Sequence, residues 1–240
     1  MSEIIVERHE GWAEIVFNRP ERRNAIDLAF AQQFLAALEG LNGDENLRAV
    51  VLSGAGGFYC SGLDLKAFVP PPPWREEFNV IWRGVHTALI DSPKALIVAL
   101  QGGAINGGAA LAFAGDLVVA GRSSFIQVGE LQLGMPIPYN TSWLVLKHGE
   151  AAALRFCMMA DRVGAEDLLR LGIATEIVEE AAAPARAREI AARIAGWPAA
   201  PLGVAKRGVR ATARRMSAAD FFELAAAPAA LRNFAPQKVS

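Results

Sequence analysis

One local pattern occurs twice in this chain: a short apolar run, then a glycine-rich turn, then a helix-like segment. The first copy covers residues 48–68 and the second residues 95–114. "RAVVLSG" (48–54) and "ALIVAL" (95–100) are apolar runs typical of strands buried on both faces of a parallel sheet. Repeated units of this kind predict parallel strands joined by crossover helices, so we expect an α/β fold.

Further elements are predicted around these two strands. Residues 4–9 and 12–19 alternate apolar and polar side chains around Glu10-Gly11, which predicts a hairpin. Asp27 is expected to cap a helix that ends between Gly40 and Gly43. After an exposed proline loop at 69–74 we expect, in order, a helix over 75–91, a strand over 116–121, helices over 150–160 and 164–172, and a strand over 174–178.

The chain is expected to divide near residue 180. Residues 1–180 are predicted to form the α/β core, and residues 181–240 a helical region broken at Trp197-Pro198. This region carries more apolar positions than a lone helix can leave exposed, namely Leu202, Val204, Phe221, Phe222 and Leu224. We therefore expect it to dock on the core or on a neighbouring subunit.

Composition argues against several classes of protein. Hydrophobic residues make up 52% and charged residues 20% of the 240, with a formal net charge of -1, which indicates a globular chain without a nucleic-acid surface or a polybasic membrane patch. The N-terminus is too charged for a secretory signal, and no apolar run approaches the ~18 residues of a membrane helix. Cys60 and Cys157 lack the spacing of a zinc or redox site. We expect a cytoplasmic protein that has no metal centre and contacts neither nucleic acid nor membrane.

The glycine turn "GGAINGGAALAFAGD" (102–116) fits neither the dinucleotide nor the P-loop spacing. It predicts a helix N-terminus with Gly107 and Gly108 at its mouth, where unpaired backbone N–H groups favour negative charge. The turn "CSGLDL" (60–65) offers the same arrangement. Two such donors aimed at one point would form an oxyanion hole. Tight packing is the alternative role of such glycines, but two turns after two parallel strands favour a ligand site.

Five segments carry a resemblance to a known family. They are "FNRPERRNAID", "AVVLSGAGGFYCSGLDLKAF", "SPKALIVALQGGAINGGAALAFAGDLVVA", "FIQVGELQLGMPIP" and "GAEDLLRLGIATEIV", and they lie in order over roughly residues 12–178. In this order they resemble the crotonase superfamily, also called the enoyl-CoA hydratase/isomerase family. The resemblance implies a spiral of repeated ββα units with a C-terminal helical region, an acyl-CoA thioester substrate in fatty acid metabolism, and a homotrimer or hexamer. It implies no separate cofactor, because coenzyme A is part of the substrate.

The resemblance also implies roles for particular residues. The backbone N–H groups of Leu63 and Gly107 would hold the thioester oxygen as the oxyanion hole. The remaining substrate-binding positions would be those along the 19–27 loop and beside the two donors, namely Arg22, Arg23, Ala25, Gly62, Asp64, Lys66 and Gly108. Each basic residue among them has an ordinary solvated surface charge as its alternative role.

One catalytic position departs from the family pattern. Hydratases of the family carry two glutamates; Glu130 matches one of them, but Ala110 stands at the place of the other. Asn106 stands where many relatives have glycine. Moving a double bond along an acyl chain needs a single base, whereas adding water is managed comfortably by two carboxylates. The "GELQLGMPIPY" segment most resembles the Δ3,Δ2-enoyl-CoA isomerases of the family, which use a single glutamate at the place of Glu130. We therefore expect Glu130 to act alone in an apolar pocket that raises its pKa.

Three functions follow from this pattern. The first is enoyl-CoA isomerisation, the second hydration or other crotonase chemistry such as hydrolysis or carbon–carbon cleavage, and the third non-catalytic acyl-CoA binding, which Ala110 motivates. Among other candidates, His86 is expected to be a core or surface histidine, and Asp64 and Asp116 to be caps. Helical spacing indicates either an acyl channel or plain core packing for Trp74, Phe78 and Trp82.

Overall fold

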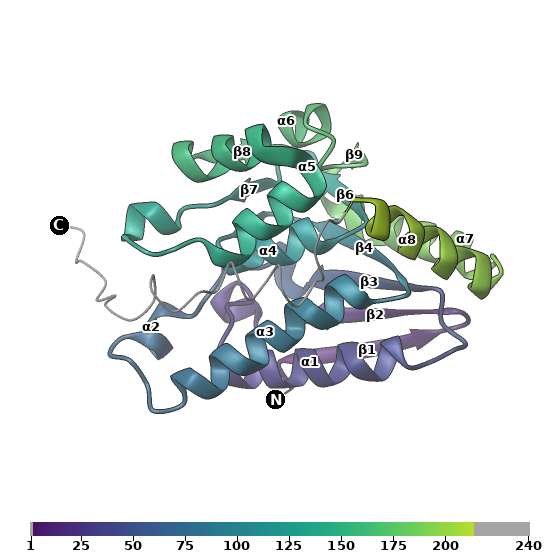
Figure 1. Cartoon of the computed structure of the whole chain (residues 1–240), viewed down its shortest axis with the longest axis horizontal. Helices are drawn as coiled ribbons and strands as arrows, with labels where there is room; N and C mark the ends of the chain where they lie inside the picture. Colours follow the sequence, from purple (N-terminus) through teal and green to yellow (C-terminus); the bar gives the residue numbers. More distant parts are fainter. Residues whose placement is uncertain (1, 214–240) are drawn as a thin grey trace.

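The computed structural model describes residues 2–213 and confirms the predicted α/β class. Its main sheet has six strands, in the order β1 (Ile4–His9), β2 (Trp12–Phe17), β3 (Ala49–Gly54), β4 (Ala95–Leu100), β6 (Leu117–Gly121) and β9 (Glu176–Val178). β1 and β2 form the predicted antiparallel hairpin, and the other neighbouring pairs are parallel. The two apolar runs are therefore the adjacent strands β3 and β4, whose carboxyl ends share one edge of the sheet (Figure 1).

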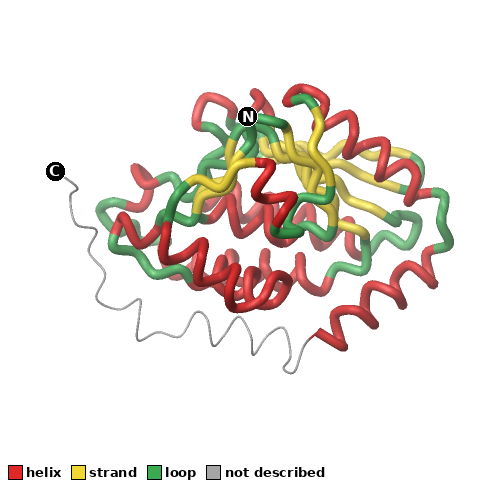
Figure 2. The backbone as a smooth tube through the Cα atoms, turned by 90° about the horizontal axis from the view of Figure 1, so that it is seen from above, coloured by secondary structure: helices red, strands yellow, loops and turns green. Residues whose placement is uncertain are grey.

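Helices cover both faces of this sheet, as Figure 2 shows. One face packs against α1 (Leu28–Asn42), α3 (Arg75–Asp91) and α4 (Gly107–Ala114), and α5 (Pro138–Met159) packs on α4. The other face packs against α7 (Ala183–Ala195). Successive residues of β3 alternate between the two cores, with Val50 and Leu52 in one and Ala49 and Val51 in the other. Burial on both faces explains why β3 and β4 are apolar throughout.

The ends of α1 follow the sequence prediction. The Asp27 carboxylate accepts a hydrogen bond from the backbone N–H of Phe30 at 2.9 Å, and the helix ends before Gly43. An N-cap of this kind satisfies one of the backbone N–H groups that the first turn leaves unpaired. α3 occupies the predicted residues 75–91.

Asp116 is not a helix cap, so that prediction is wrong. The residue precedes strand β6, and its Oδ2 accepts a hydrogen bond from the Leu96 backbone N–H at 2.8 Å. The carboxylate also pairs with Lys206 at 2.6 Å and with Arg210 at 2.9 Å, both on α8 (Ala199–Ala213). Asp116 therefore joins two strands of the sheet to the last described helix.

A second, small sheet is absent from the sequence prediction. It contains β5 (Gly103–Ile105), β7 (Phe125–Gln127) and β8 (Arg162–Gly164), and three residues are too few to display an alternating pattern. β5 lies inside the segment predicted as a glycine turn and pairs in parallel with β7. This pairing brings the segment that follows β7, including the 3₁₀ helix η3 (Glu130–Leu133), beside the start of α4.

The remaining elements are short or interrupted. α5 is two helical segments that meet at Gly149, and the second corresponds to the helix predicted over 150–160. α6 (Ala165–Arg170) is shorter than predicted, because β8 includes Gly164 and a turn follows at residues 171–172. Connections include α2 (Leu65–Phe68) and the 3₁₀ helices η1 (Pro20–Arg22), η2 (Ala55–Gly57) and η4 (Glu180–Ala182).

The C-terminal part is described as far as residue 213. The break at Trp197-Pro198 separates α7 from α8, as predicted. α7 shares a buried core with the sheet, and the division of the chain at residue 180 stays a prediction. Phe221, Phe222 and Leu224 lie outside the described residues. Among the helices of residues 2–213, none is both long and apolar enough to cross a membrane.

Candidate active site

The two glycine turns lie against each other at the carboxyl edge of β3 and β4. The Cys60 backbone N–H donates to the Gly103 carbonyl at 3.1 Å, and the Ile105 N–H donates to the Cys60 carbonyl at 3.0 Å. Gly108 is buried here, because a Cβ at this position would lie 2.3 Å from the Cys60 carbonyl oxygen. The absence of a side chain at residue 108 therefore serves the close packing of the two turns.

The backbones of Leu63 and Gly107 lie close together where the two turns pack. Gly62 has a φ of +86°, and a Cβ there would lie 2.6 Å from the Ile105 carbonyl oxygen and 3.3 Å from the Gly107 nitrogen. A Cβ built on Gly107 would lie 3.9 Å from the Leu63 nitrogen. Only glycine at residue 62 allows an approach this close without strain.

The direction of the Leu63 N–H follows from its neighbours. The Ile26 N–H donates to the Gly62 carbonyl and the Asp64 N–H donates to the Ile26 carbonyl, both at 2.8 Å. In a parallel bridge of this type, the N–H of the middle residue points away from the partner strand. The Leu63 N–H therefore points away from Ile26, and Gly107 supplies the first N–H of α4, which belongs to the positive end of the helix dipole.

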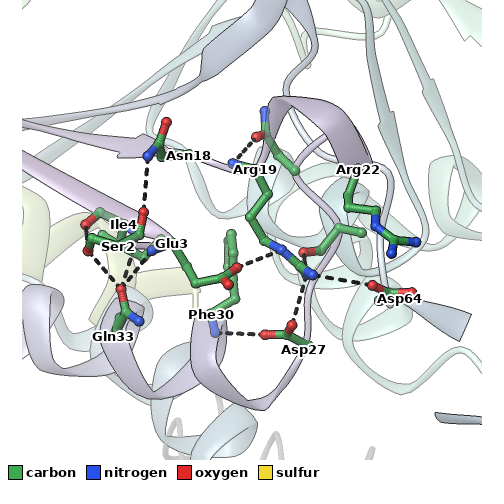
Figure 3. Close-up of polar contacts among 12 residues, drawn as sticks. Ser2, Glu3, Ile4, Asn18, Arg19, Arg22, Asp27, Phe30, Gln33 and Asp64 are labelled. Carbon is green, nitrogen blue, oxygen red and sulfur yellow. Dashed lines mark hydrogen bonds and ion pairs between the residues drawn. The ribbon is translucent and has the colours of Figure 1, made fainter. Parts of the chain in front are cut away.

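Arg19 holds the 19–27 loop against the first turn (Figure 3). Its guanidinium pairs with Glu3 at 2.6 Å, with Asp27 at 3.0 Å and with Asp64 at 3.3 Å, and it donates to the Ala25 carbonyl at 2.6 Å. Asp64 stands at the N-cap position of α2 but makes no capping hydrogen bond with its side chain. The prediction of a capping role for Asp64 is therefore wrong, because the carboxylate is engaged by Arg19.

The other residues predicted to bind the substrate differ in exposure. Arg22, Arg23 and Lys66 are exposed, and the Arg23 guanidinium lies 5.7 Å from the centre of the Phe58 ring. Ala25 is buried. The three basic residues thus lie at the surface, two at the end of η1 and one on α2, the helix that follows the first turn.

Glu130 is a buried carboxylate at the start of η3, with 8% of its surface exposed. Its Oε1 accepts a hydrogen bond from Asn140 Nδ2 at 2.7 Å, and its Oε2 has no hydrogen-bond partner among residues 2–213. Burial raises the pKa of Glu130 to about 7, against smaller lowering effects of its own backbone N–H and of Asn140. A carboxylate of this pKa exchanges a proton readily near neutral pH.

Asn106 connects the two turns to Glu130. Its backbone has a φ of +52°, a conformation that side chains rarely adopt and that costs about 1–3 kcal/mol. The Asn106 Oδ1 accepts a hydrogen bond from the Gly129 N–H at 2.8 Å, which offsets part of this cost. The Asn106 N–H donates to the Gln127 carbonyl at 2.9 Å. Asn106 therefore fixes the segment before Glu130 against the start of α4.

Ala110 is completely buried within the first turns of α4. Its methyl side chain can neither carry a proton nor hold a water molecule. Burial, the backbone N–H of Glu130 and Asn140 are the causes of the shifted pKa of Glu130, so no second carboxylate of the described residues acts on it. Among the described residues, Glu130 is therefore the candidate acid–base group of this site.

His86 belongs to a buried aromatic cluster instead of the acid–base site. Burial lowers its pKa to about 3, Trp143 Nε1 donates to its Nδ1 at 2.9 Å, and its ring stacks on Tyr139 with centroids 4.1 Å apart. Phe78 and Trp82 are buried in the same core, and Trp74 is partly buried beside them. The histidine is thus neutral near pH 7.

Two residues that shape this site are missing from the sequence prediction. Arg19 lies in the "FNRPERRNAID" segment, but its three carboxylate partners come from different parts of the chain. Asn140 stands ten residues after Glu130 with no motif around it. Only the fold brings these partners together, so neither residue had a local signal.

Comparison with known proteins places the chain in a family. Residues 7–227 match the family described as Enoyl-CoA hydratase/isomerase. A Rhodobacter capsulatus protein named "Probable enoyl-CoA hydratase" is 32% identical over 208 residues, which are 84% of this chain and 79% of the relative. The 1,2-epoxyphenylacetyl-CoA isomerase of Escherichia coli is 28% identical, over 87% of this chain and 82% of its own.

Solved structures agree with this match. The structure of Pseudomonas aeruginosa DspI has a TM-score of 0.83 and 28% identity, and the similarity covers 90% of this chain and 89% of that chain. This similarity confirms the crotonase-like α/β fold expected from the sequence. The chain belongs to the enoyl-CoA hydratase/isomerase family of acyl-CoA enzymes, the crotonase superfamily.

Proposed function

We propose that the chain isomerises enoyl-CoA thioesters by moving a double bond along the acyl chain, with Glu130 as the only proton carrier. The observation that carries this proposal is the state of Glu130. Its carboxylate is buried, has one oxygen without a partner among the described residues, and has a pKa raised by burial to about 7. A group near its pKa can both take and return a proton, which double-bond migration requires.

The enolate formed in this reaction needs a place for its negative charge. In the proposal, the backbone N–H groups of Leu63 and Gly107 hold the thioester oxygen, and each donor contributes ~2.7–4 kcal/mol by analogy with other oxyanion holes. The adjoining positions of the two residues and the helix N-terminus at Gly107 support this role. In the proposal, the close packing that Gly62 and Gly108 permit would aim the two donors at one oxygen.

Coenzyme A is proposed to lie along the 19–27 loop. The exposed Arg22, Arg23 and Lys66 would attract its phosphates, and Ala25 would face its body. Asp64 would act through Arg19, which holds the loop in place. The proposal needs no separate cofactor or metal, and it retains the homotrimer or hexamer and the cytoplasmic location as expectations.

Ala110 favours isomerisation over hydration. Adding water across a double bond requires a group that activates water and a group that protonates the neighbouring carbon, and the methyl side chain at residue 110 can do neither. The relatives include proteins named as isomerases of CoA thioesters and proteins named as hydratases, so the preference for isomerisation rests on residue 110.

The test uses a 3-enoyl-CoA and a 2-enoyl-CoA as separate substrates. We expect the first to become the conjugated 2-enoyl-CoA, at a rate that rises with pH as Glu130 ionises through about pH 7. Glu130→Gln should lower kcat by about 10²–10⁴-fold. The matched control is Glu150→Gln, which changes an exposed carboxylate of α5 and should retain the wild-type rate. A wild-type product heavier by one water, release of free CoA, or full activity in Glu130→Gln would overturn the proposal.

A further inference from the structure

The Asn140 side chain contacts both halves of the proposed site. Its Nδ2 donates to Glu130 Oε1 at 2.7 Å and to the Asn106 carbonyl oxygen at 2.9 Å. Asn140 lies in the first turn of α5 and is buried, with 2% of its surface exposed. Both hydrogens of one amide group are thus used inside the site.

The chemistry of the two acceptors determines the orientation of this amide. A rotation by half a turn would place Asn140 Oδ1 against the Glu130 carboxylate and the Asn106 carbonyl, and oxygens would then face oxygens. The observed orientation leaves Oδ1 without a hydrogen-bond partner among residues 2–213. A buried acceptor without a partner is unfavourable, but the observed orientation keeps both donated hydrogen bonds.

The Asn106 carbonyl belongs to the same peptide group as the Gly107 N–H. That carbonyl accepts from Asn140 and also from the Ala110 N–H at 3.1 Å. Hydrogen bonds accepted by a peptide carbonyl polarise the group and strengthen its N–H as a donor. They also restrain the rotation of a peptide whose Asn106 φ is +52°.

We propose that Asn140 is a positioning residue that holds the Glu130 carboxylate and the Asn106–Gly107 peptide in one fixed relation. This inference rests on the proposed function. By occupying Oε1, Asn140 leaves Oε2 as the oxygen that carries the proton. Oε2 takes a proton from C2 of the 3-enoyl thioester, and the electron pair of the broken C–H bond moves onto the thioester oxygen. Oε2 then returns the proton to C4, where the electron pair of the C3–C4 double bond takes it. The pair on the oxygen re-forms the carbonyl, and the C1–C2 pair moves to form the double bond between C2 and C3.

The charged surroundings of Glu130 make this role measurable. The hydrogen bond from Asn140 lowers the pKa of Glu130, in opposition to the larger effect of burial. Cys157, in the second segment of α5, is the other titratable group that interacts electrostatically with Glu130. Burial and, to a smaller extent, the charge of Glu130 raise the pKa of the Cys157 thiol to about 11, so this thiol is neutral near pH 7. Other described charged groups do not contribute to the shift at Glu130. Removing the Asn140 donor should therefore raise the pKa of Glu130 further.

The experiment compares Asn140→Leu with Ser142→Ala. Leucine has the same branching of side-chain heavy atoms as asparagine, is bulkier, and donates no hydrogen bond. Ser142 is a matched control, because it is buried in the same helical turn and its hydroxyl donates only to the Pro138 carbonyl at 2.9 Å. The ionisation of Glu130 is read from the infrared band of its protonated carboxyl group, with Glu130→Gln as the reference. The kinetic parameters are measured with a 3-enoyl-CoA across the same pH range.

We expect Asn140→Leu to raise the midpoint of the Glu130 titration and to lower kcat by about 100-fold with little change in KM. Ser142→Ala should change neither. An Asn140→Leu protein with the wild-type midpoint, or with the wild-type kcat, would overturn the inference. If leucine prevents folding, Asn140→Ala is judged by the same two results. The infrared titration needs no turnover, so a wild type without isomerase activity would refute the proposed function and still leave Asn140 tested.

Discussion

The burial of Glu130 predicts a pH-dependent stability that Glu130→Gln removes. In the folded protein burial raises the pKa of Glu130 from 4.5 to about 7, so the native state holds a proton that the unfolded chain releases above pH 4.5. This contribution to stability is complete below the unfolded pKa and is lost as the pH rises through the folded pKa. Glutamine is neutral at every pH and accepts the same hydrogen bond from Asn140, so the variant lacks this loss.

The size of the effect follows from the two pKa values. At about 1.4 kcal/mol for each pKa unit, the wild type should lose about 3 kcal/mol relative to Glu130→Gln between about pH 4.5 and pH 8. Urea unfolding of both proteins, followed by tryptophan fluorescence at matched protein concentration across this range, measures the difference in the free energy of unfolding. The variant should become the more stable protein at alkaline pH, although it should be the less active one.

The control for this experiment is Glu150→Gln, since the Glu150 side chain is exposed. The difference in the free energy of unfolding between Glu150→Gln and the wild type should stay the same at all pH values. The reasoning would be refuted by a difference between the wild type and Glu130→Gln that stays constant with pH, because the carboxylate would then have an ordinary pKa in the fold.

Two further predictions concern the scaffold. Glu14 is completely buried and pairs at 2.6 Å with the half-exposed Arg188 of α7, so Arg188→Ala should lower the free energy of unfolding by about 1–3 kcal/mol in urea titrations. Arg193→Ala, on the same helix, is the control and should have little effect, because no ion pair of the described residues involves Arg193. Gly62→Ala should reduce both stability and kcat, because its φ is +86° and the added Cβ would lie 2.6 Å from a carbonyl oxygen; thermal unfolding and turnover equal to the wild type would contradict this reading.

The predictable part of the fold is the part with long or repeated local patterns. β3 and β4 are apolar at every position because both of their faces are buried, and the chemistry of the Asp27 cap marks the start of α1. The strands β5, β7 and β8 escape prediction, since three residues display no period and their pairing depends on the packing around them.

The candidate site also has features that the sequence predicts and features that only the fold creates. The two glycine turns are visible in the sequence, and the resemblance to the family singled out Glu130. The partnership of Glu130 with Asn140 is not visible, because it depends on the turn between them. Gly134 has a φ of +66° at the end of η3, and it reverses the chain so that the first turn of α5 returns to the carboxylate. Long-range contacts of this kind leave no periodic signal.

The central claim is that one carboxylate carries the same proton from one carbon of the acyl chain to another. The direct test is a single turnover of a 3-enoyl-CoA labelled with deuterium at C2, followed by analysis of the product by mass and by NMR. A 2-enoyl-CoA of unchanged skeleton that carries part of the label at C4 is the predicted result, because the buried Glu130 returns the deuteron it has taken. A hydrated product, or a conjugated product that never carries deuterium at C4, would contradict the claim.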